Sequence, residues 1–352
     1  MMIPHRHYGL TALGRHFLLA ACAVLLSATA WAQSGKKVFQ FVELPTSARI
    51  GALGGVQQAI AEADLNLAAV NPAFLSAETE NRLAVNYVNY VAGISVADVA
   101  YSFHTPFAPG TLAAGLQYLN SGKSTRYDEF GNAAGSFSSN EWAVRLSYSQ
   151  HFDSCFSIGA TVKPAFSSIG GYFSMGLLAD VSAAYNFRNG NTAASILLRN
   201  FGAQIVSYDG NYSDTPFEIL ASISHQLEHA PFRMSLVLQQ LQKFNLKPQK
   251  DNNPDIGSEV EDNSNKLPDF IDNCLRHCVL GVELFPDKSF NARFGFNYKR
   301  RQELKLSNSP GMAGVSLGFG LRLKRFSIEY ANACYTLGGR SNHFSLLINL
   351  PK

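Results

Sequence analysis

The stretch "AGVSLGFGLRL", residues 313–323, alternates between large apolar side chains and small or polar ones. Such a period of two is typical of a β-strand whose two faces meet different surroundings. A soluble β-sandwich also alternates, but its outward positions carry charged or long polar side chains rather than Gly and Ser. The pattern here therefore indicates a strand with lipid on its apolar face and a crowded or watery lumen on the other.

The same period recurs along most of the chain. We mark strands at 82–90, 94–104, 110–121, 139–152, 155–168, 174–187, 192–207, 215–228, 231–245, 274–285, 289–302, 312–323, 325–336 and 341–350. Segments of this length match tilted membrane strands, and short connections alternate with longer ones. The sequence therefore predicts an all-β fold, a 14-stranded antiparallel transmembrane β-barrel over residues 81–352. Long outer loops are expected near 122–138 and 246–273, and both chain ends at the short-turn, periplasmic end.

Composition agrees with a lipid-facing surface. Charged residues make up only 16% of the chain and aromatic residues 12%. The 29 Lys and Arg nearly balance the 26 Asp and Glu, so the sequence lacks the basic excess that nucleic-acid binding requires. Aromatic residues near strand ends are expected to form interfacial girdles: Tyr87, Tyr101, Trp142, Tyr148, Phe152, Tyr185, Phe187, Tyr298 and Tyr335.

Residues 1–32 have the features of a cleaved export signal. An apolar run at 17–26 follows two arginines, and Ala30-Trp31-Ala32 supplies a small-residue cleavage site before Gln33. A lipoprotein signal ending at Cys22 is the alternative, but it leaves an apolar run too short for an export signal. We therefore expect an exported chain in the bacterial outer membrane.

The segment 33–80 precedes the first strand and is expected to fill the lumen as an internal hatch. A barrel of this size is too wide for side chains alone to fill. Gly51, Gly54 and Gly55 would let the backbone pack closely against the wall, and a short helix would end ahead of Asn71-Pro72-Ala73. A flexible periplasmic leader is the alternative.

Five charged residues fall on the inward faces of predicted strands. Because unpaired buried charge is costly, we expect them to pair with each other, with the hatch or with trapped water. They are Arg145, Asp180, Arg293, Arg322 and Glu329.

Three segments carry a family resemblance: residues 41–55 ("FVELPTSARIGALGG"), 64–75 ("DLNLAAVNPAFL") and 83–94 ("LAVNYVNYVAGI"). They resemble the start of the PorQ family, outer-membrane components of the type IX secretion system. The Asn71-Pro72-Ala73 motif and the strand number resemble the wider FadL-like family of plugged barrels. The first resemblance implies a non-enzymatic barrel without a cofactor or metal. It would anchor the surface protein PorZ in the complex that attaches secreted cargo, together with the sortase PorU and the barrel PorV. The second allows a transporter of hydrophobic small molecules with a moving hatch.

The acidic segment 246–273 is the candidate partner loop. It would act through an electrostatic contact or as a calcium-ordered loop, or simply be a solvated loop; its acids are Asp251, Asp255, Glu259, Glu261, Asp262, Asp269 and Asp272. Just after it, Cys274 and Cys278 flank a histidine. A zinc site would need further ligands and a disulfide a tight turn, so two small residues at a strand start are the simplest interpretation.

Overall fold

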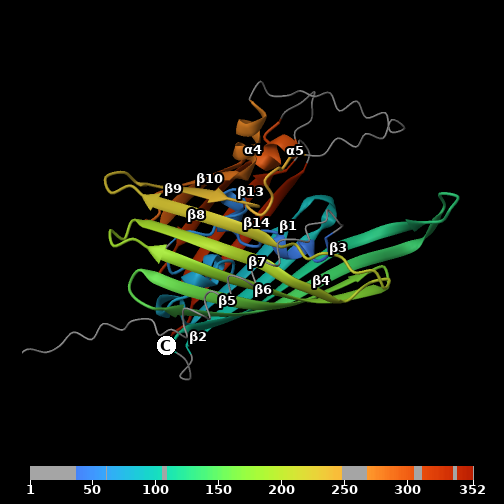
Figure 1. Ribbon diagram of the computed structural model, residues 1–352, viewed down its shortest axis with the longest axis horizontal. Coiled ribbons are helices and arrows are strands. Elements are labelled where there is room, and N and C mark those ends of the chain that lie inside the picture. The colour runs from blue at the N-terminus through green and yellow to red at the C-terminus, as the bar shows by residue number, and fades with distance from the viewer. Residues whose placement is uncertain are drawn as a thin grey trace, which may run out of the picture. The chain divides into compact units, whose positions relative to one another are not determined.

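The computed structural model describes residues 37–60, 62–104, 109–247, 268–304, 311–335 and 339–351. Within these residues, 14 strands form one closed barrel in which neighbours along the chain pair with each other and β1 closes on β14. Every pairing is antiparallel. The predicted fold class is therefore confirmed (Figure 1).

The strands have these bounds: β1 Arg82–Asn89, β2 Ser95–His104, β3 Thr111–Tyr127, β4 Ala133–His151, β5 Phe156–Ile169, β6 Tyr172–Asn186, β7 Thr192–Val206, β8 Glu218–Gln226, β9 Phe232–Leu238, β10 Cys278–Leu284, β11 Phe290–Asn297, β12 Val315–Arg322, β13 Phe326–Cys334 and β14 Arg340–Asn349. The helices are η2 Gln40–Glu43, α2 Ala48–Ala52, α3 Leu65–Ala68, η3 Pro72–Phe74, η4 Ala77–Thr79, η5 Val91–Gly93, α4 Asp269–His277 and α5 Tyr298–Leu304. None of the helices in the described ranges is long and apolar enough to cross a membrane.

Burial follows the predicted alternation. On β12, Leu317 and Phe319 are 50% and 48% exposed, whereas Ser316, which lies on the lumen side of the strand, is 0% exposed. Leaving a row of large apolar side chains outside a closed sheet is favourable only when lipid surrounds it. The apolar outer face of the barrel is thus the lipid-facing surface, and the polar inner faces of the strands line the lumen.

The two ends of the barrel differ. One end carries short turns, such as those between β4 and β5 and between β12 and β13, together with the end of β14. The opposite end, here called the outer end, carries α4, α5 and the β3–β4 hairpin (Figure 1). The short and long connections therefore separate as the sequence predicts.

Two predicted strand ends are helices instead. Residues 274–277 belong to α4 and residues 298–302 to α5, where the sequence predicts the start of one strand and the end of the next. In α4, acidic residues in the first turn and basic residues in the last suit the helix dipole, and Arg276 Nε donates to Asp272 Oδ2 at 2.9 Å one turn away. These local charge patterns outweigh the strand period.

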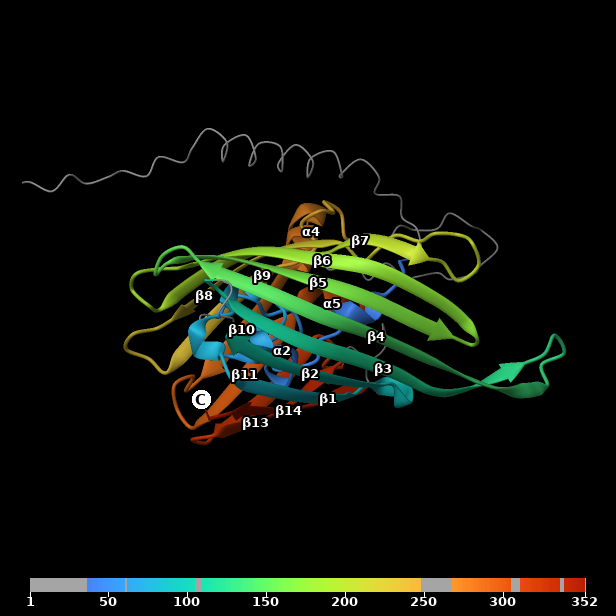
Figure 2. The same ribbon diagram turned by 90° about the horizontal axis from the view of Figure 1, so that it is seen from below.

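The long connection expected at 122–138 does lie at the outer end, but its residues are mostly in strands rather than in an irregular loop. β3 and β4 continue through it as a two-stranded hairpin that extends past the neighbouring strands (Figure 2). The turn is short because Asp128 closes it: its Oδ1 accepts from the backbone N–H of Phe130 at 2.9 Å and of Asn132 at 2.8 Å. Ser and Thr, which favour strands when paired, continue the ladder outward.

We expected both chain ends at the short-turn end: β14 ends there, whereas residues 1–36 lie outside the described residues and the described chain begins at the outer end. Lys37, the first described residue, bridges to Asp214, and Val38 N donates to Asp214 O at 2.9 Å. Asp214 belongs to the β7–β8 connection at the outer end. From Lys37 at the outer end the described chain therefore runs through the lumen to the short-turn end, where β1 begins at Arg82.

Candidate functional site in the barrel lumen

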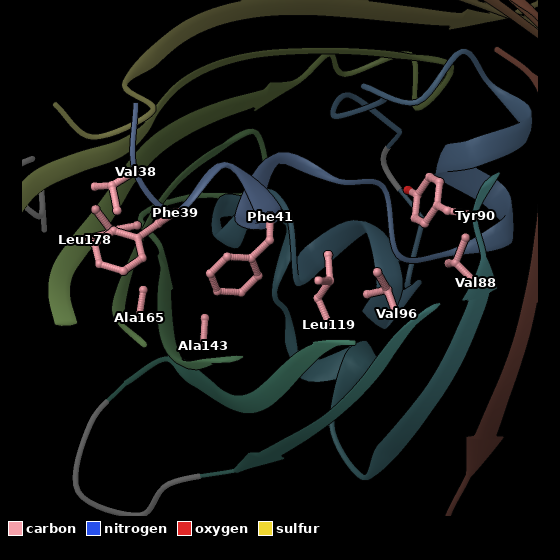
Figure 3. Packing of buried hydrophobic residues seen from close by; sticks show 10 residues of the cluster. All are labelled: Val38, Phe39, Phe41, Val88, Tyr90, Val96, Leu119, Ala143, Ala165 and Leu178. Atoms are coloured by element: carbon pink, nitrogen blue, oxygen red, sulfur yellow. The ribbon is translucent and has the colours of Figure 1, made fainter. Parts of the chain in front are cut away.

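Residues 37–81, here called the hatch, lie inside the barrel. Near the outer end, Val38, Phe39 and Phe41 pack against inward side chains such as Leu119 and Leu178 (Figure 3). Further along the chain, α2 packs against β12, β13 and β14, and η3 against β5. The hatch thus contacts opposite sides of the wall.

Glycine makes this close packing feasible. Gly54 and Gly55 have φ values of +91° and +90°, and a Cβ on Gly54 would lie 2.5 Å from Val279 Cγ1 on β10. A Cβ on Gly51 would lie 3.0 Å from the buried His343 ring on β14. On the wall, a Cβ at Gly318 would lie 2.6 Å from Ala52 Cβ. Small residues on both surfaces let hatch and wall backbones touch.

The Asn71-Pro72-Ala73 motif joins the hatch to β5, β6 and β7. Asn71 Nδ2 donates to Ser195 Oγ at 3.0 Å, and Ala73 N donates to Ser182 Oγ at 3.0 Å. Ser157 Oγ in turn donates to Ala73 O at 2.7 Å. The polar groups of the motif are therefore satisfied by serines of the lumen wall.

Arg49 of α2 is the centre of a large ion-pair network. Its side chain is fully buried, with Nε and Nη2 each donating at 2.9 Å to one oxygen of Glu283 on β10. Nη1 donates to Glu62 at 2.8 Å and to Asp64 at 2.9 Å, both on the hatch. The guanidinium therefore links the hatch to the wall through charge-assisted, bidentate bonds.

Wall residues extend this network around the lumen. Glu283 also accepts from Arg233 Nη1 at 2.9 Å and from Arg293 Nε at 3.0 Å. Arg293 Nη2 continues to Glu329 Oε1 at 2.8 Å. Because every member has an opposite charge within contact, burial of this many charges is tolerated.

A second group of ion pairs lines the lumen between β2 and β8. Lys163 Nζ lies 2.7 Å from Asp180 Oδ1, and Arg199 Nε donates to Glu218 Oε2 at 2.7 Å. A bulge on β7 sets this arrangement: Asn200, with φ +58°, donates its backbone N–H to Asp180 Oδ1 at 2.7 Å. The extra residue turns two successive side chains toward the lumen.

All five predicted inward charges lie in the lumen, each beside an opposite charge. The pairs are Arg145 with Asp98, Asp180 with Lys163, Arg293 with Glu283 and Glu329, and Arg322 with Glu62. The sequence did not single out Arg49, Glu62 or Glu283. Glu283 is two residues after the inward-facing Gly281, so the alternation along the strand indicates that its side chain also faces the lumen. Arg49 lies in a segment without such alternation, so nothing in the sequence indicates where its side chain lies.

Two aromatic residues expected in the girdles have other positions. Tyr298 begins α5 and donates its hydroxyl to Asp272 Oδ1 at 2.7 Å. The Tyr335 ring packs edge-on against Tyr90, with the Arg300 guanidinium carbon 4.4 Å from its centroid. Both serve contacts at the outer end rather than the lipid boundary.

A cavity of about 40 Å³ remains between the hatch and the second group of ion pairs. Glu43, Arg145, Lys163, Asp180 and Arg199 contribute to its lining, together with apolar hatch residues. This space admits a few water molecules. It is far smaller than the several hundred Å³ (about 300–1,000 Å³) of a typical small-molecule site.

The candidate partner loop is described only in part. Asp251, Asp255, Glu259, Glu261 and Asp262 lie outside the described residues. Asp269 is exposed at the start of α4, and Asp272 is buried in the α4–α5 contact.

Cys274 lies in α4, Cys278 starts β10, and neither forms a disulfide. The described residues contain no group of three or more His, Cys, Asp or Glu side chains arranged to hold a metal ion.

No protein-family model matches the chain, and no curated protein matches its sequence. Among solved structures, the toluene transporter TodX of Pseudomonas putida aligns with a TM-score of 0.51 at 12% identity, covering 89% of this chain and 98% of TodX. A mutant of TodX, described as a monoaromatic hydrocarbon channel, gives 0.51 at 12% identity over 87% and 97% of the two chains. A Pseudomonas aeruginosa FadL homologue gives 0.48 at 11% identity over 86% and 98%.

At such low identity the similarity to TodX shows the fold alone. The chain is a 14-stranded transmembrane β-barrel with the fold of TodX and a hatch inside its lumen.

Proposed function

We propose that the chain is an outer-membrane barrel that keeps its hatch in place and holds a protein partner at its outer end. The supporting observation is the lumen: the Arg49 network joins the hatch to five wall strands, β9 to β13, and the cavity beside the hatch has a volume of about 40 Å³ and a partly charged lining. A hydrophobic ligand would need a larger, mostly apolar site. A fixed hatch instead makes the barrel a rigid support.

The outer end has the elements that a support requires. α4, α5 and the β3–β4 hairpin all lie there, whereas the opposite end has short turns. The resemblance to the PorQ family suggests the finer role: anchoring a PorZ-like surface protein in the type IX attachment complex, beside PorU and PorV. That role is structural and needs no catalytic step, cofactor or metal.

A hatch-locking disulfide tests this proposal. Ala52 of α2 and Ala331 of β13 pack together, so Ala52→Cys with Ala331→Cys, in a chain whose own cysteines are replaced by alanine, would join hatch and wall. We expect the oxidised barrel to retain its surface partner on intact cells as well as the reduced barrel does. Loss of the partner on oxidation, or absence of any partner on the solubilised wild-type barrel, would refute the support role.

Transport of hydrophobic small molecules is the second candidate, favoured by the fold of TodX and by one local feature. The β4–β5 pairing is interrupted where Val144 and Arg145 face Lys163 and Pro164, because proline has no N–H to donate. The interruption borders the charged cavity. A lateral passage would open there if the hatch moved.

The same disulfide separates the two functions. Under the transport proposal, oxidation abolishes uptake of a labelled monoaromatic hydrocarbon or fatty acid by cells, and reduction restores it. Pro164→Val should lower uptake as well, since valine can complete the ladder. Uptake that is unaffected by the lock would rule out a moving hatch.

A further inference from the structure

The β3–β4 hairpin has strand edges without partners. β2 pairs with β3 only as far as Asn120, and β5 pairs with β4 only from Ser139 onward. Beyond these points residues 123–138 form a two-stranded ribbon (Figure 2). Its five β3 residues, Lys123–Tyr127, are all exposed.

Such a ribbon is marginally stable in water, because it buries little and leaves half of its backbone hydrogen-bonding groups facing solvent. Two of its four residue pairs are polar, Lys123 with Ser138 and Thr125 with Ser136, and the other two each contain one aromatic side chain, Phe137 or Tyr127. At the tip, Phe130 is 87% exposed and Tyr127 64% exposed. A third strand would satisfy the free backbone groups and cover aromatic surface.

The two edges are not equivalent. On β4, Ala134 and Gly135 together stand opposite Arg126, and Gly135 has φ +111°, so a bulge interrupts that edge. The base of the same edge is already used, since Gly170 N donates to Ser138 O at 3.3 Å. The β3 edge runs from Lys123 to Tyr127 without proline or a positive φ value. The β3 edge is therefore the better template for strand addition.

The charges on the β3 edge indicate the chemistry of the added strand. Lys123 and Arg126 form no ion pair with any of the described residues; the Arg126 side chain reaches across β4, where its Nη2 donates to Gly170 O at 3.4 Å. Edge cations discourage indiscriminate pairing, and they favour a strand that carries acidic side chains. Within Lys123–Tyr127 both charged side chains are thus cationic, and the acids Asp128 and Glu129 follow only at the tip.

We propose that the β3 edge of this hairpin, Lys123–Tyr127, binds an extended acidic segment of the surface partner by β-strand addition. This inference rests on the proposed support function and names its contact. Backbone hydrogen bonds would provide affinity, and Lys123 and Arg126 would select the acidic sequence.

The test uses the full chain in intact cells, with a photo-crosslinking amino acid at Ser124 on β3 or at Ser136 on β4. We expect Ser124 to crosslink to an acidic segment of a surface protein, and amide exchange at 123–127 to slow in the purified complex. Lys123→Glu with Arg126→Glu should lower the crosslink yield by about tenfold or more. The matched control, Lys324→Glu with Arg325→Glu at the short-turn end, has the same charge change and should leave the yield unaltered.

Other outcomes overturn the inference. Crosslinks from Ser124 to a second copy of this chain or to its own residues 251–262 would assign the edge to another occupant. A crosslink yield from Ser136 equal to that from Ser124 would refute strand addition at the β3 edge. A yield from Ser124 that does not change with Lys123→Glu and Arg126→Glu would refute it as well. If the partner co-purifies with the barrel but no hairpin crosslink forms, only this inference fails; if no partner is retained, the support function fails with it.

Discussion

Arg49 and Glu283 join the hatch to the barrel wall through two parallel hydrogen bonds of 2.9 Å each. One residue comes from a short helix near the start of the described chain and the other from β10, 234 positions later. No local pattern brings them together, so the pair exists only because the barrel closes around the hatch. Its strength is therefore a direct measure of how firmly the hatch is held.

Arg49→Met should destabilise the barrel strongly. It leaves Glu283, Glu62 and Asp64 with fewer cations in a buried site, at a cost of about 3–5 kcal/mol. The unfolding temperature in detergent, followed by the gel mobility shift on heating, measures this loss. Lys324→Met, at an exposed turn, is the control and should unfold like the wild type; equal stability of the two variants would contradict a role for the network in holding the hatch.

Gly54→Ala should be more destabilising than Gly131→Ala. Both glycines have positive φ values, +91° and +79°, so both substitutions strain the backbone by about 1–3 kcal/mol. Only at Gly54 would the new Cβ meet another group, Val279 Cγ1 at 2.5 Å, whereas Gly131 has open space. Urea unfolding in detergent gives the difference, which isolates the contact between hatch and wall. Equal losses would show that the hatch can shift away from β10.

Asn71→Ala should lower stability by about 1–3 kcal/mol. The side chain is fully buried and donates to Ser195 Oγ and to Gln58 O, each at 3.0 Å, so its loss leaves buried acceptors unsatisfied. Asn189→Ala in an exposed turn removes a comparable side-chain bond, to Thr192 at 3.2 Å, and serves as the control. Thermal unfolding in detergent compares them. A loss no larger than that of the control would mean that the motif is not needed to fix the hatch.

The contact between α4 and α5 should persist under mild acid. Burial raises the pKa of Asp272, but hydrogen bonds from Arg276 and Tyr298 outweigh it, so the pKa is lowered overall. A carboxyl group with a depressed pKa stabilises the fold fully above its unfolded value of about 4 and loses this contribution as the pH falls through its folded value. The protection of the amides of residues 273–277, after correction for the intrinsic pH dependence of exchange, should therefore stay constant from pH 7 to about pH 4.

Asp272→Asn is the matched variant for this titration. The amides of residues 273–277 should be less protected in this variant than in the wild type from pH 7 to about pH 4, because the ion pair with Arg276 is absent. A loss of this protection in the wild type already at pH values well above 4 would contradict the lowered pKa.

The strand period predicted the barrel because lipid imposes one rule on every strand. Leu317 and Phe319 had to face outward and Ser316 inward, whichever strands lay beside them. The same reasoning placed Arg293 and Arg322 in the lumen. It could not name their partners, because Glu283, Glu329 and Glu62 reach them only through closure and through the path of the hatch.

Local features that interrupt the period were harder to predict. The strand predicted from residue 274 begins instead at Cys278, because residues 274–277 belong to α4, whose apolar residues Phe270, Ile271, Cys274 and Leu275 recur at helical spacing. The bulge at Asn200 depends on a backbone hydrogen bond to Asp180 on another strand. The extension of the β3–β4 hairpin depends on pairing between two polar segments. From their composition alone, these segments are predicted to form a loop.

The bridge between Lys37 and Asp214 has a consequence for biogenesis. The hatch precedes β1 in the chain, runs inward from the outer end, and is enclosed once β1 pairs with β14. If the barrel closed first, the hatch with its charged residues Arg49, Glu62 and Asp64 would have to pass unpaired along the packed lumen. The strands must therefore assemble around the hatch, so that the pairing of β1 with β14 closes the barrel when the hatch is already in the lumen.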